Sequence, residues 1–188
     1  RHHSEQRLGV QLTGRNVDEV VKAAGMLDRE GFDTIDINMG CPVRKVVHSG
    51  SGSAFLKDTQ RISNPLAGVK AVVTRPLSAK CRIGFTREAL NITEVAPRIA
   101  TAGCDAMTIH GRTRDCTFAA PVQYDKIREG AEAARTWAAV RAAKSTDGTG
   151  AAARRRRRRS RRSARVARHS GQERRCARRR LVEMASGR

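Results

Sequence analysis

Hydrophobic positions along residues 7–143 form four repeats of a short apolar run followed by a longer amphipathic stretch. The apolar runs predict strands and the amphipathic stretches predict helices. Asn16 suits the N-cap of the first predicted helix, and Gly31 suits its end. Pro97 predicts a kink in the third predicted helix. The expected strands are residues 7–14, 32–40, 77–84 and 104–113, and the expected helices are residues 16–31, about 53–74, 87–103 and 124–143.

Strands that alternate with helices predict a parallel sheet with right-handed crossovers, and therefore an α/β fold. Polar or reactive residues recur at or just past the carboxyl ends of the predicted strands. Parallel βα arrays place their chemistry at that edge, whether the sheet is open or closed into a barrel. The residues that share this placement are Gln11, Asn38, Cys41, Lys80 and His110.

Charge divides the chain into two regions. Residues 1–130 carry 19 Lys and Arg against 14 Asp and Glu, whereas residues 131–188 carry 19 against 4. After Lys144 no apolar face recurs, and repulsion among like charges predicts disorder. We expect a βα domain at residues 1–144 and a basic, low-complexity tail at residues 145–188.

Two interpretations of this tail remain open. Its arginines could neutralise nucleic-acid phosphates, so that the protein would be a basic nucleic-acid-binding protein and deletion of residues 145–188 would remove nearly all of that affinity. The near absence of aromatic residues argues against sequence-selective binding. Alternatively, runs of Ala, Arg and Gly are typical of GC-rich DNA read in a shifted frame. We favour the shifted frame because the tail begins where the βα rhythm requires another strand.

Several classes of site are disfavoured. No run approaches the roughly 20 apolar residues of a membrane span, and the first residues have no signal-peptide apolar region. The five cysteines have neither C-x-x-C spacing nor histidines at metal-ligand intervals. We therefore expect reduced thiols, no metal, no membrane partner and a cytoplasmic location.

Cys41 has the strongest chemical signal, within the segment "DINMGCPVRKVVHSGSGSAFL". It follows a strand and stands near Arg44, Lys45 and His48, whose positive field favours a reactive thiol. The glycine- and serine-rich segment 48–53 offers backbone N–H groups to an anion or a closely approaching ligand. The alternatives are a cysteine that packs as a small hydrophobic residue and a plain loop.

Two further residues suggest an anionic ligand. Lys80 lies in an apolar strand, where an unpaired ammonium is unfavourable, so we expect it to face a site with negative charge. The alternative is a lysine that reaches solvent from the strand end. His110 ends the fourth strand and is followed by Arg112 and Arg114, a pattern that indicates phosphate or other anion contact. A histidine that only donates and accepts structural hydrogen bonds is the alternative.

The segments "DINMGCPVRKVVHSGSGSAFLKD", "AKCRIGF" and "GCDAMTIHGRTRDCTFAAPVQYDKI" together resemble the bacterial-type tRNA-dihydrouridine synthases, flavin enzymes on a (β/α)8 barrel. The resemblance covers residues 8–130 in order. Dihydroorotate dehydrogenases and other FMN barrels share a lysine and a Cys or Ser near these strand ends, but not the combined pattern. A reductase of that kind, acting on a small molecule, would need a pocket that Arg112 and Arg114 do not face.

The resemblance implies an oxidoreductase that reduces the C5–C6 bond of uridine in tRNA, with FMN as cofactor and NADPH as electron donor. Cys41 matches the acid that protonates C5. Gln11, Lys80 and His110 match residues that hold the flavin, and Lys80 would stabilise its reduced anionic form. The residues expected to contact the uracil, the flavin edge or the RNA are Asn38, Lys45, Arg112 and Arg114.

The sequence departs from the family pattern at both ends. The family has about two further βα units before this region and, after its last helix, a strand of the "IPVIGNGDI" type with a Gly-Arg loop for the FMN phosphate. We therefore expect a partial (β/α)8 barrel of about four βα units, with unpaired edges and exposed apolar faces. We also expect this polypeptide alone to bind FMN weakly and to turn over slowly. The sequence predicts neither the tRNA position that is modified nor the oligomeric state.

Overall fold

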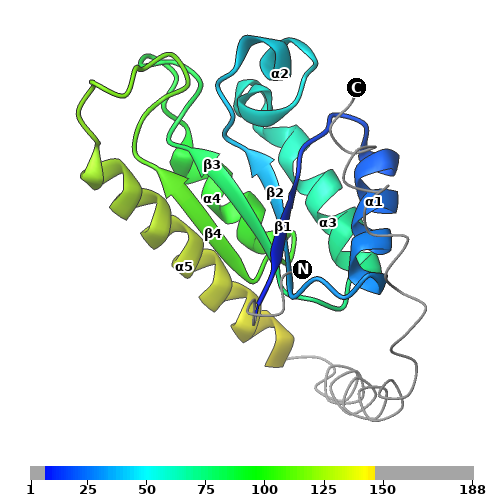
Figure 1. Ribbon diagram of the computed structural model, residues 1–188. Helices are drawn as coiled ribbons and strands as arrows, with labels where there is room; N and C mark the ends of the chain where they lie inside the picture. Colours follow the sequence, from blue (N-terminus) through cyan, green and yellow to red (C-terminus); the bar gives the residue numbers. More distant parts are fainter. Residues whose placement is uncertain (1–6, 147–188) are drawn as a thin grey trace. The chain divides into compact units, whose positions relative to one another are not determined.

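The computed structural model describes residues 7–146, which form a four-stranded parallel sheet with helices after the strands (Figure 1). The strands are β1 (Gly9–Leu12), β2 (Thr34–Met39), β3 (Leu77–Arg82) and β4 (Ala106–His110). The helices are α1 (Val17–Arg29), α2 (Arg44–His48), α3 (Ser63–Val72), α4 (Ile92–Thr101) and α5 (Tyr124–Thr146), with 3-10 helices η1 (Gly52–Lys57) and η2 (Thr59–Ile62). The predicted α/β fold with four βα units is confirmed. Ser145 and Thr146, the first two residues of the predicted tail, are the last two of α5, and the rest of the tail lies outside the described residues. The domain boundary at residue 144 stays a prediction.

The strands are ordered β1-β2-β3-β4 and every neighbouring pair is parallel. The register places Ile37 beside Ala79, and Lys80 beside both Asn38 and Thr108. All four carboxyl ends therefore meet at one edge of the sheet, and α2 and the loop after β4 lie at that edge (Figure 1).

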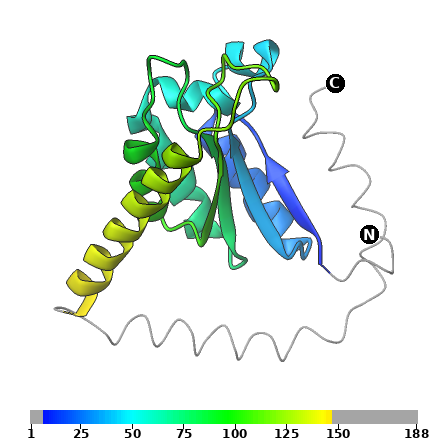
Figure 2. The same cartoon turned by 90° about the vertical axis from the view of Figure 1, so that its left-hand side faces the viewer.

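One face of the sheet packs against the helices and forms the core (Figure 2). Alternate residues of β2 and β3 point to this face because side chains on a strand alternate with a period of two. They are at most 2% exposed, and burying each aliphatic side chain contributes roughly 1.5–3 kcal/mol. The six strand residues on this face are Ile35, Ile37, Met39, Leu77, Ala79 and Cys81.

The opposite face of the sheet is polar, so the expectation of exposed apolar faces is wrong here. The strand residues that point away from the helices have small, amide, hydroxyl or charged side chains, which tolerate water. The large exposed apolar residues of the described chain all lie outside the strands. The polar-face residues of the four strands include Gln11, Thr34, Asp36, Asn38, Ser78, Lys80 and Thr108.

The start of α1 confirms the predicted N-cap. The Oδ1 atom of Asn16 accepts hydrogen bonds from the backbone N–H groups of Asp18 at 3.0 Å and Glu19 at 3.4 Å. These bonds satisfy donors that have no partner within the helix. The chain leaves α1 through Gly31, whose φ of +79° lies in the left-handed region that glycine adopts readily.

The predicted helix over residues 53–74 is divided, and this prediction was wrong in detail. Asp58 has extended backbone angles, and its carboxylate accepts a hydrogen bond from the N–H of Gln60, which separates η1 from η2. The helix predicted from residue 87 begins only at Ile92, because Gly84 and Leu90 form an isolated β-bridge before it. Pro97 lies inside α4 without ending it.

Candidate active site

Hydrogen bonds across β1, β2 and β3 organise the polar face of the sheet. Gln11 donates from Nε2 to Oδ2 of Asp36 at 2.7 Å, and Ser78 donates its hydroxyl to the other oxygen of the same carboxylate. Asn38 donates from Nδ2 to Oε1 of Gln11 at 2.8 Å. Because this bond uses the nitrogen of the Asn38 amide, its oxygen points toward the end of β2.

That oxygen holds the turn that carries Cys41. Oδ1 of Asn38 accepts hydrogen bonds from the backbone N–H groups of Gly40 at 3.0 Å and Cys41 at 2.9 Å, a short-range side-chain cap of the kind that asparagine favours. Gly52, with a φ of +59°, packs against the turn, and a Cβ there would lie 2.9 Å from the Cβ of Cys41. The half-buried thiol is thus held at the carboxyl edge of the sheet.

The glycine- and serine-rich segment after α2 supports the same turn. The N–H of Ser53 donates to the carbonyl of Cys41 at 3.1 Å. The N–H of Ser51 donates to the carbonyl of Val46 at 3.1 Å. Both serines are buried, so these N–H groups serve the fold, and the prediction that they face an anion is wrong.

Arg82, at the end of β3, is a site residue that the sequence analysis missed. It is only 6% exposed, and its guanidinium donates from Nε to the carbonyl of Gly40 at 2.8 Å and from a terminal nitrogen to the carbonyl of Thr113 at 2.9 Å. It therefore connects the Cys41 turn to the loop after β4. Burial lowers the pKa of Arg82, while the nearby thiols of Cys116 and Cys41 act in the opposite direction. The sequence did contain a signal for this residue, because Ser78, Lys80 and Arg82 alternate along β3 and therefore point to the same face.

Lys80 lies on the polar face between its register neighbours Asn38 and Thr108. It is half-buried, and among the described residues its ammonium makes no hydrogen bond and no ion pair within 4.0 Å. A partly buried cation without a counter-charge is unfavourable unless a ligand supplies one. Its position therefore fits the prediction of a site that holds negative charge.

His110 lies opposite Arg82 in the register of β3 and β4. Its Nδ1 atom is buried and has no hydrogen-bond partner. Burial lowers the pKa of His110, and the positive charges of Arg82, Lys80 and Arg112 lower it further. Both effects favour the neutral imidazole, and its Nδ1 atom has no partner among the described residues.

The carboxyl edge thus combines a positive field with polar atoms that the protein leaves unpartnered. Lys80 and His110 both fit an electron-rich ligand that carries partial or full negative charge. A reduced flavin ring, with its anionic N1–O2 region and hydrogen-bonding edge, has this chemistry. Gln11, fixed by the network on the polar face, offers a further amide at the same face. The residues present therefore fit the cofactor that the resemblance implies.

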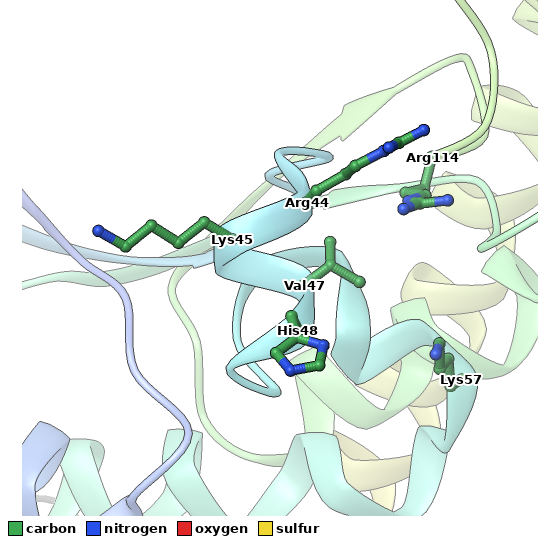
Figure 3. Close-up of a pocket in the computed structure, with 6 residues that line it drawn as sticks. All are labelled: Arg44, Lys45, Val47, His48, Lys57 and Arg114. Atoms are coloured by element: carbon green, nitrogen blue, oxygen red, sulfur yellow. The ribbon is translucent and has the colours of Figure 1, made fainter.

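The three predicted RNA-contact residues lie in different surroundings. Arg112 donates from Nε to the carbonyl of Ala120 and so folds over its own loop. Lys45 is exposed on α2, whereas Arg114 packs beside the ring of Phe85. Lys45 and Arg114 line one surface hollow, and Arg112 does not (Figure 3).

Cys116 is a second thiol near the site that the sequence analysis did not single out. Its Sγ lies 3.0 Å from the hydroxyl oxygen of Thr113. The hydrogen bonds with Thr113 and with Arg87 lower the pKa of Cys116, although partial burial acts in the opposite direction. The only signal in the sequence that Cys116 lies near the site is its position in the loop after β4.

Residues 7–146 contain neither a metal-binding cluster nor a membrane-spanning helix. In that part of the chain no three His, Cys, Asp or Glu side chains gather closely enough to hold a metal ion. The helices described there include none with the length and apolar character needed to cross a bilayer.

Curated relatives share most of this region. The chain is 40% identical over 128 residues to tRNA-dihydrouridine synthase B of Pasteurella multocida, which covers 68% of this chain and 39% of the relative. It is 40% identical over 119 residues to the proteins of that name from Yersinia pestis and Salmonella typhimurium, which covers 63% of this chain and 37% of each relative. The chain therefore spans under two fifths of the length of these relatives.

A model of the Dihydrouridine synthase (Dus) family matches residues 1–137. This match includes all four strands and every residue of the candidate site. The chain therefore belongs to the dihydrouridine synthase family.

Proposed function

We propose that this protein acts in the reduction of uridine to dihydrouridine in tRNA, as an FMN-dependent oxidoreductase with NADPH as the electron donor. The observation that carries the proposal is the placement of Cys41 at the same sheet edge as the unpaired cation of Lys80 and the unpartnered ring nitrogen of His110. The family match and the names of the relatives support the substrate class.

The polar face of the sheet supplies the flavin site. Lys80 would stabilise negative charge at the ring, His110 would offer a neutral imidazole, and Gln11 would offer its amide. When bound, the reduced flavin supplies the hydride that adds to C6 of the uracil. Lys80, His110 and Gln11 would hold the ring, and Asn38 would hold the turn that carries the Cys41 thiol.

Cys41 supplies the proton that completes the reduction. The thiol proton goes to C5 of the uracil while C6 gains a hydride, so the C5–C6 double bond becomes a single bond and the thiolate remains. Proton transfer requires hydrogen-bond reach, and the amide of Asn38 provides this by fixing the backbone of the Cys41 turn. Nδ2 of Asn38 donates once to Gln11, and its second N–H would be left to orient the uracil or the flavin edge.

The target uridine must leave its stack in the tRNA to reach this edge, which costs unstacking energy. Folded RNA is held mainly through its shape and backbone phosphates, for which Lys45, Arg112 and Arg114 are the proposed contacts. A cytoplasmic location follows from this substrate and stays part of the proposal.

The test is a single-turnover reaction with the full chain. The purified protein, loaded with excess FMN and reduced by NADPH, is incubated with unmodified tRNA transcript, and the product is measured by mass spectrometry as nucleosides. We expect slow formation of dihydrouridine, and a rate roughly 10²–10⁴-fold lower for Cys41→Ala, because the general acid is removed.

Two comparisons make this test decisive. Cys104→Ala is the matched control, since it removes a cysteine from outside the site and leaves the rate unchanged. Equal rates for Cys41→Ala and Cys104→Ala would contradict the role of Cys41. Reduction of free uridine as fast as uridine in tRNA would favour a reductase of small molecules instead.

A further inference from the structure

A basic hollow of about 560 Å³ opens beside helix α2 (Figure 3). Figure 3 shows Arg44 extending toward Arg114, with His48 and Lys57 below them, while Lys45 extends away from the others. Helix α2, which supplies most of its wall, begins only three residues after Cys41. The basic hollow is lined by Arg44, Lys45, Val47, His48, Lys57 and Arg114.

The positive charge of the basic hollow is not balanced by the protein. None of its six lining residues is acidic. Among the described residues, Arg44, Lys57 and Arg114 take part in no ion pair within 4.0 Å. Cations that line one hollow without a carboxylate repel one another, and a bound anion relieves that repulsion.

Two of these cations are held in place by one aromatic ring. The Nζ atom of Lys57 lies 4.7 Å from the centroid of the Phe85 ring, and the Cζ atom of Arg114 lies 5.2 Å from it. Cation–π contacts orient both side chains before any ligand arrives. The Nε atom of Arg114 is also buried without an acceptor, so the protein does not supply all the acceptors that this guanidinium needs.

We propose that the basic hollow binds a backbone phosphate of the RNA strand next to the uridine that Cys41 protonates. This inference rests on the proposed function and extends it to Arg44 and Lys57, with Phe85 as the platform that orients Lys57 and Arg114. Phosphate contacts set the register of a nucleic acid on a protein without reading its sequence. A phosphate bound here would fix the strand on α2, the helix that begins three residues after Cys41.

The form of the basic hollow favours a strand over a small free anion. Its cations come from three separate segments, at α2, the end of η1 and the loop after β4, and they surround an open surface. The nearby N–H groups of Ser51 and Ser53 are already bonded to carbonyls and do not enclose a ligand. Exposed, dispersed lysine and arginine side chains are typical of contacts to a phosphodiester backbone.

The experiment measures RNA binding rather than turnover. A labelled oligoadenylate is titrated with the full chain by fluorescence anisotropy across a series of NaCl concentrations. Oligoadenylate contains no uridine, so binding is measured even if the proposed reaction fails. The variants Arg114→Gln and Lys57→Gln are compared with Arg75→Gln and Lys22→Gln, which remove the same charge from exposed positions outside the hollow.

We expect each hollow variant to lower the slope of log K against log salt by about 0.7, and to weaken binding about fivefold at 0.1 M NaCl. The control variants keep the slope of the wild-type chain. Lys57 is exposed, so its variant tests the proposal even if the Arg114 variant unfolds. Equal slopes for hollow and control variants would overturn the proposal.

A second titration distinguishes the source of the phosphate. NADPH binding to the same variants is measured by equilibrium dialysis. We expect NADPH affinity to be unchanged in Lys57→Gln. If NADPH binding weakens while RNA binding does not, the basic hollow holds a dinucleotide phosphate and the assignment to RNA is wrong.

Discussion

The two faces of the sheet carry out different tasks with alternate residues of the same strands. On the helix-covered face, Ile37 and Cys81 are at most 2% exposed and have neighbours on every side. On the polar face, Asn38 and Lys80 stand beside each other in register and contribute amide and ammonium groups to an open surface. Substitutions on the first face should therefore change stability, and substitutions on the second should change ligand binding.

The difference between the two faces also explains how a four-stranded sheet can carry polar groups that have no partner within the described part of the protein. A buried face that is apolar throughout supplies the stability, and the opposite face is then free to hold the unpaired cation of Lys80 and the unpartnered imidazole of His110. The carboxyl edge joins the two, because Arg82 leaves the polar face of β3 and becomes buried between the loops after β2 and β4.

The largest expected effect is on the helix-covered face. Ile37→Ala removes a buried side chain and leaves a cavity, so the free energy of unfolding should fall by about 2–5 kcal/mol. Thr108→Ala on the polar face, which is exposed, should change it by less than about 0.5 kcal/mol. Urea denaturation followed by circular dichroism measures both. Similar denaturation midpoints for the two variants would show that the two faces do not differ as described.

The cysteines offer a chemical version of the same comparison. Burial raises the pKa of Cys81 to about 12, whereas the hydrogen bonds with Thr113 and Arg87 lower the pKa of Cys116. Since the thiolate is the nucleophile, iodoacetamide at pH 7.5 should modify Cys81 at least about thirtyfold more slowly than Cys116. Mass spectrometry of digested protein at successive times gives both rates. Equal rates in the folded chain would contradict the burial of β3.

Arg82 tests the connection between the faces. Arg82→Lys keeps the charge but cannot donate to the carbonyls of both Gly40 and Thr113, which leaves at least one buried acceptor unpaired. We expect a loss of about 1.5 kcal/mol in the free energy of unfolding. Amide hydrogen exchange should also accelerate at Cys41, whose turn Arg82 supports. Unchanged exchange at Cys41 would show that the connection has no effect on the turn.

His110 should produce the smallest effect, visible as pH dependence. Burial and neighbouring cations lower the pKa of His110 in the folded state, below the value of about 6.5 in an unfolded chain. The unfolded state therefore takes up the proton first, and stability that is present above pH 6.5 is lost as the pH falls through the folded-state pKa.

Replacing this residue removes that contribution. For His110→Gln, the fall in stability between pH 7 and pH 5 should be smaller than in the wild-type chain, by less than about 1 kcal/mol. Thermal unfolding at a series of pH values measures it. Parallel pH profiles for the two proteins would show that the imidazole is not in the cationic surroundings described.

The fold was largely predictable because strand alternation is a local signal. The four apolar runs identified β1 to β4, and Asn16 marked the start of α1. Helix α2 was missed because its five residues are too few to show a helical period, and the division at Asp58 depends on a capping bond to Gln60. The pattern of hydrophobic residues contains no signal for so short a helix or for a single capping hydrogen bond.

The site was predictable only in part. Its location followed from the rule that chemistry lies at the carboxyl ends of parallel strands. The role of Arg82 was not predictable, because its acceptors lie 42 and 31 residues away along the chain. The polar character of the uncovered face was visible in the alternate residues of β2 and β3, but the partial barrel suggested exposed apolar surface instead.

The most direct test of the central claim is a flavin titration of the full chain, followed by quenching of FMN fluorescence. The claim is that the polar face around Lys80 binds the flavin, so the wild-type chain and the control Lys22→Met should show weak, saturable quenching with the same Kd. Lys80→Met should raise that Kd at least about tenfold, the equivalent of about 1.4 kcal/mol. An unchanged Kd in Lys80→Met, or no saturable quenching in the wild-type chain, would contradict the account.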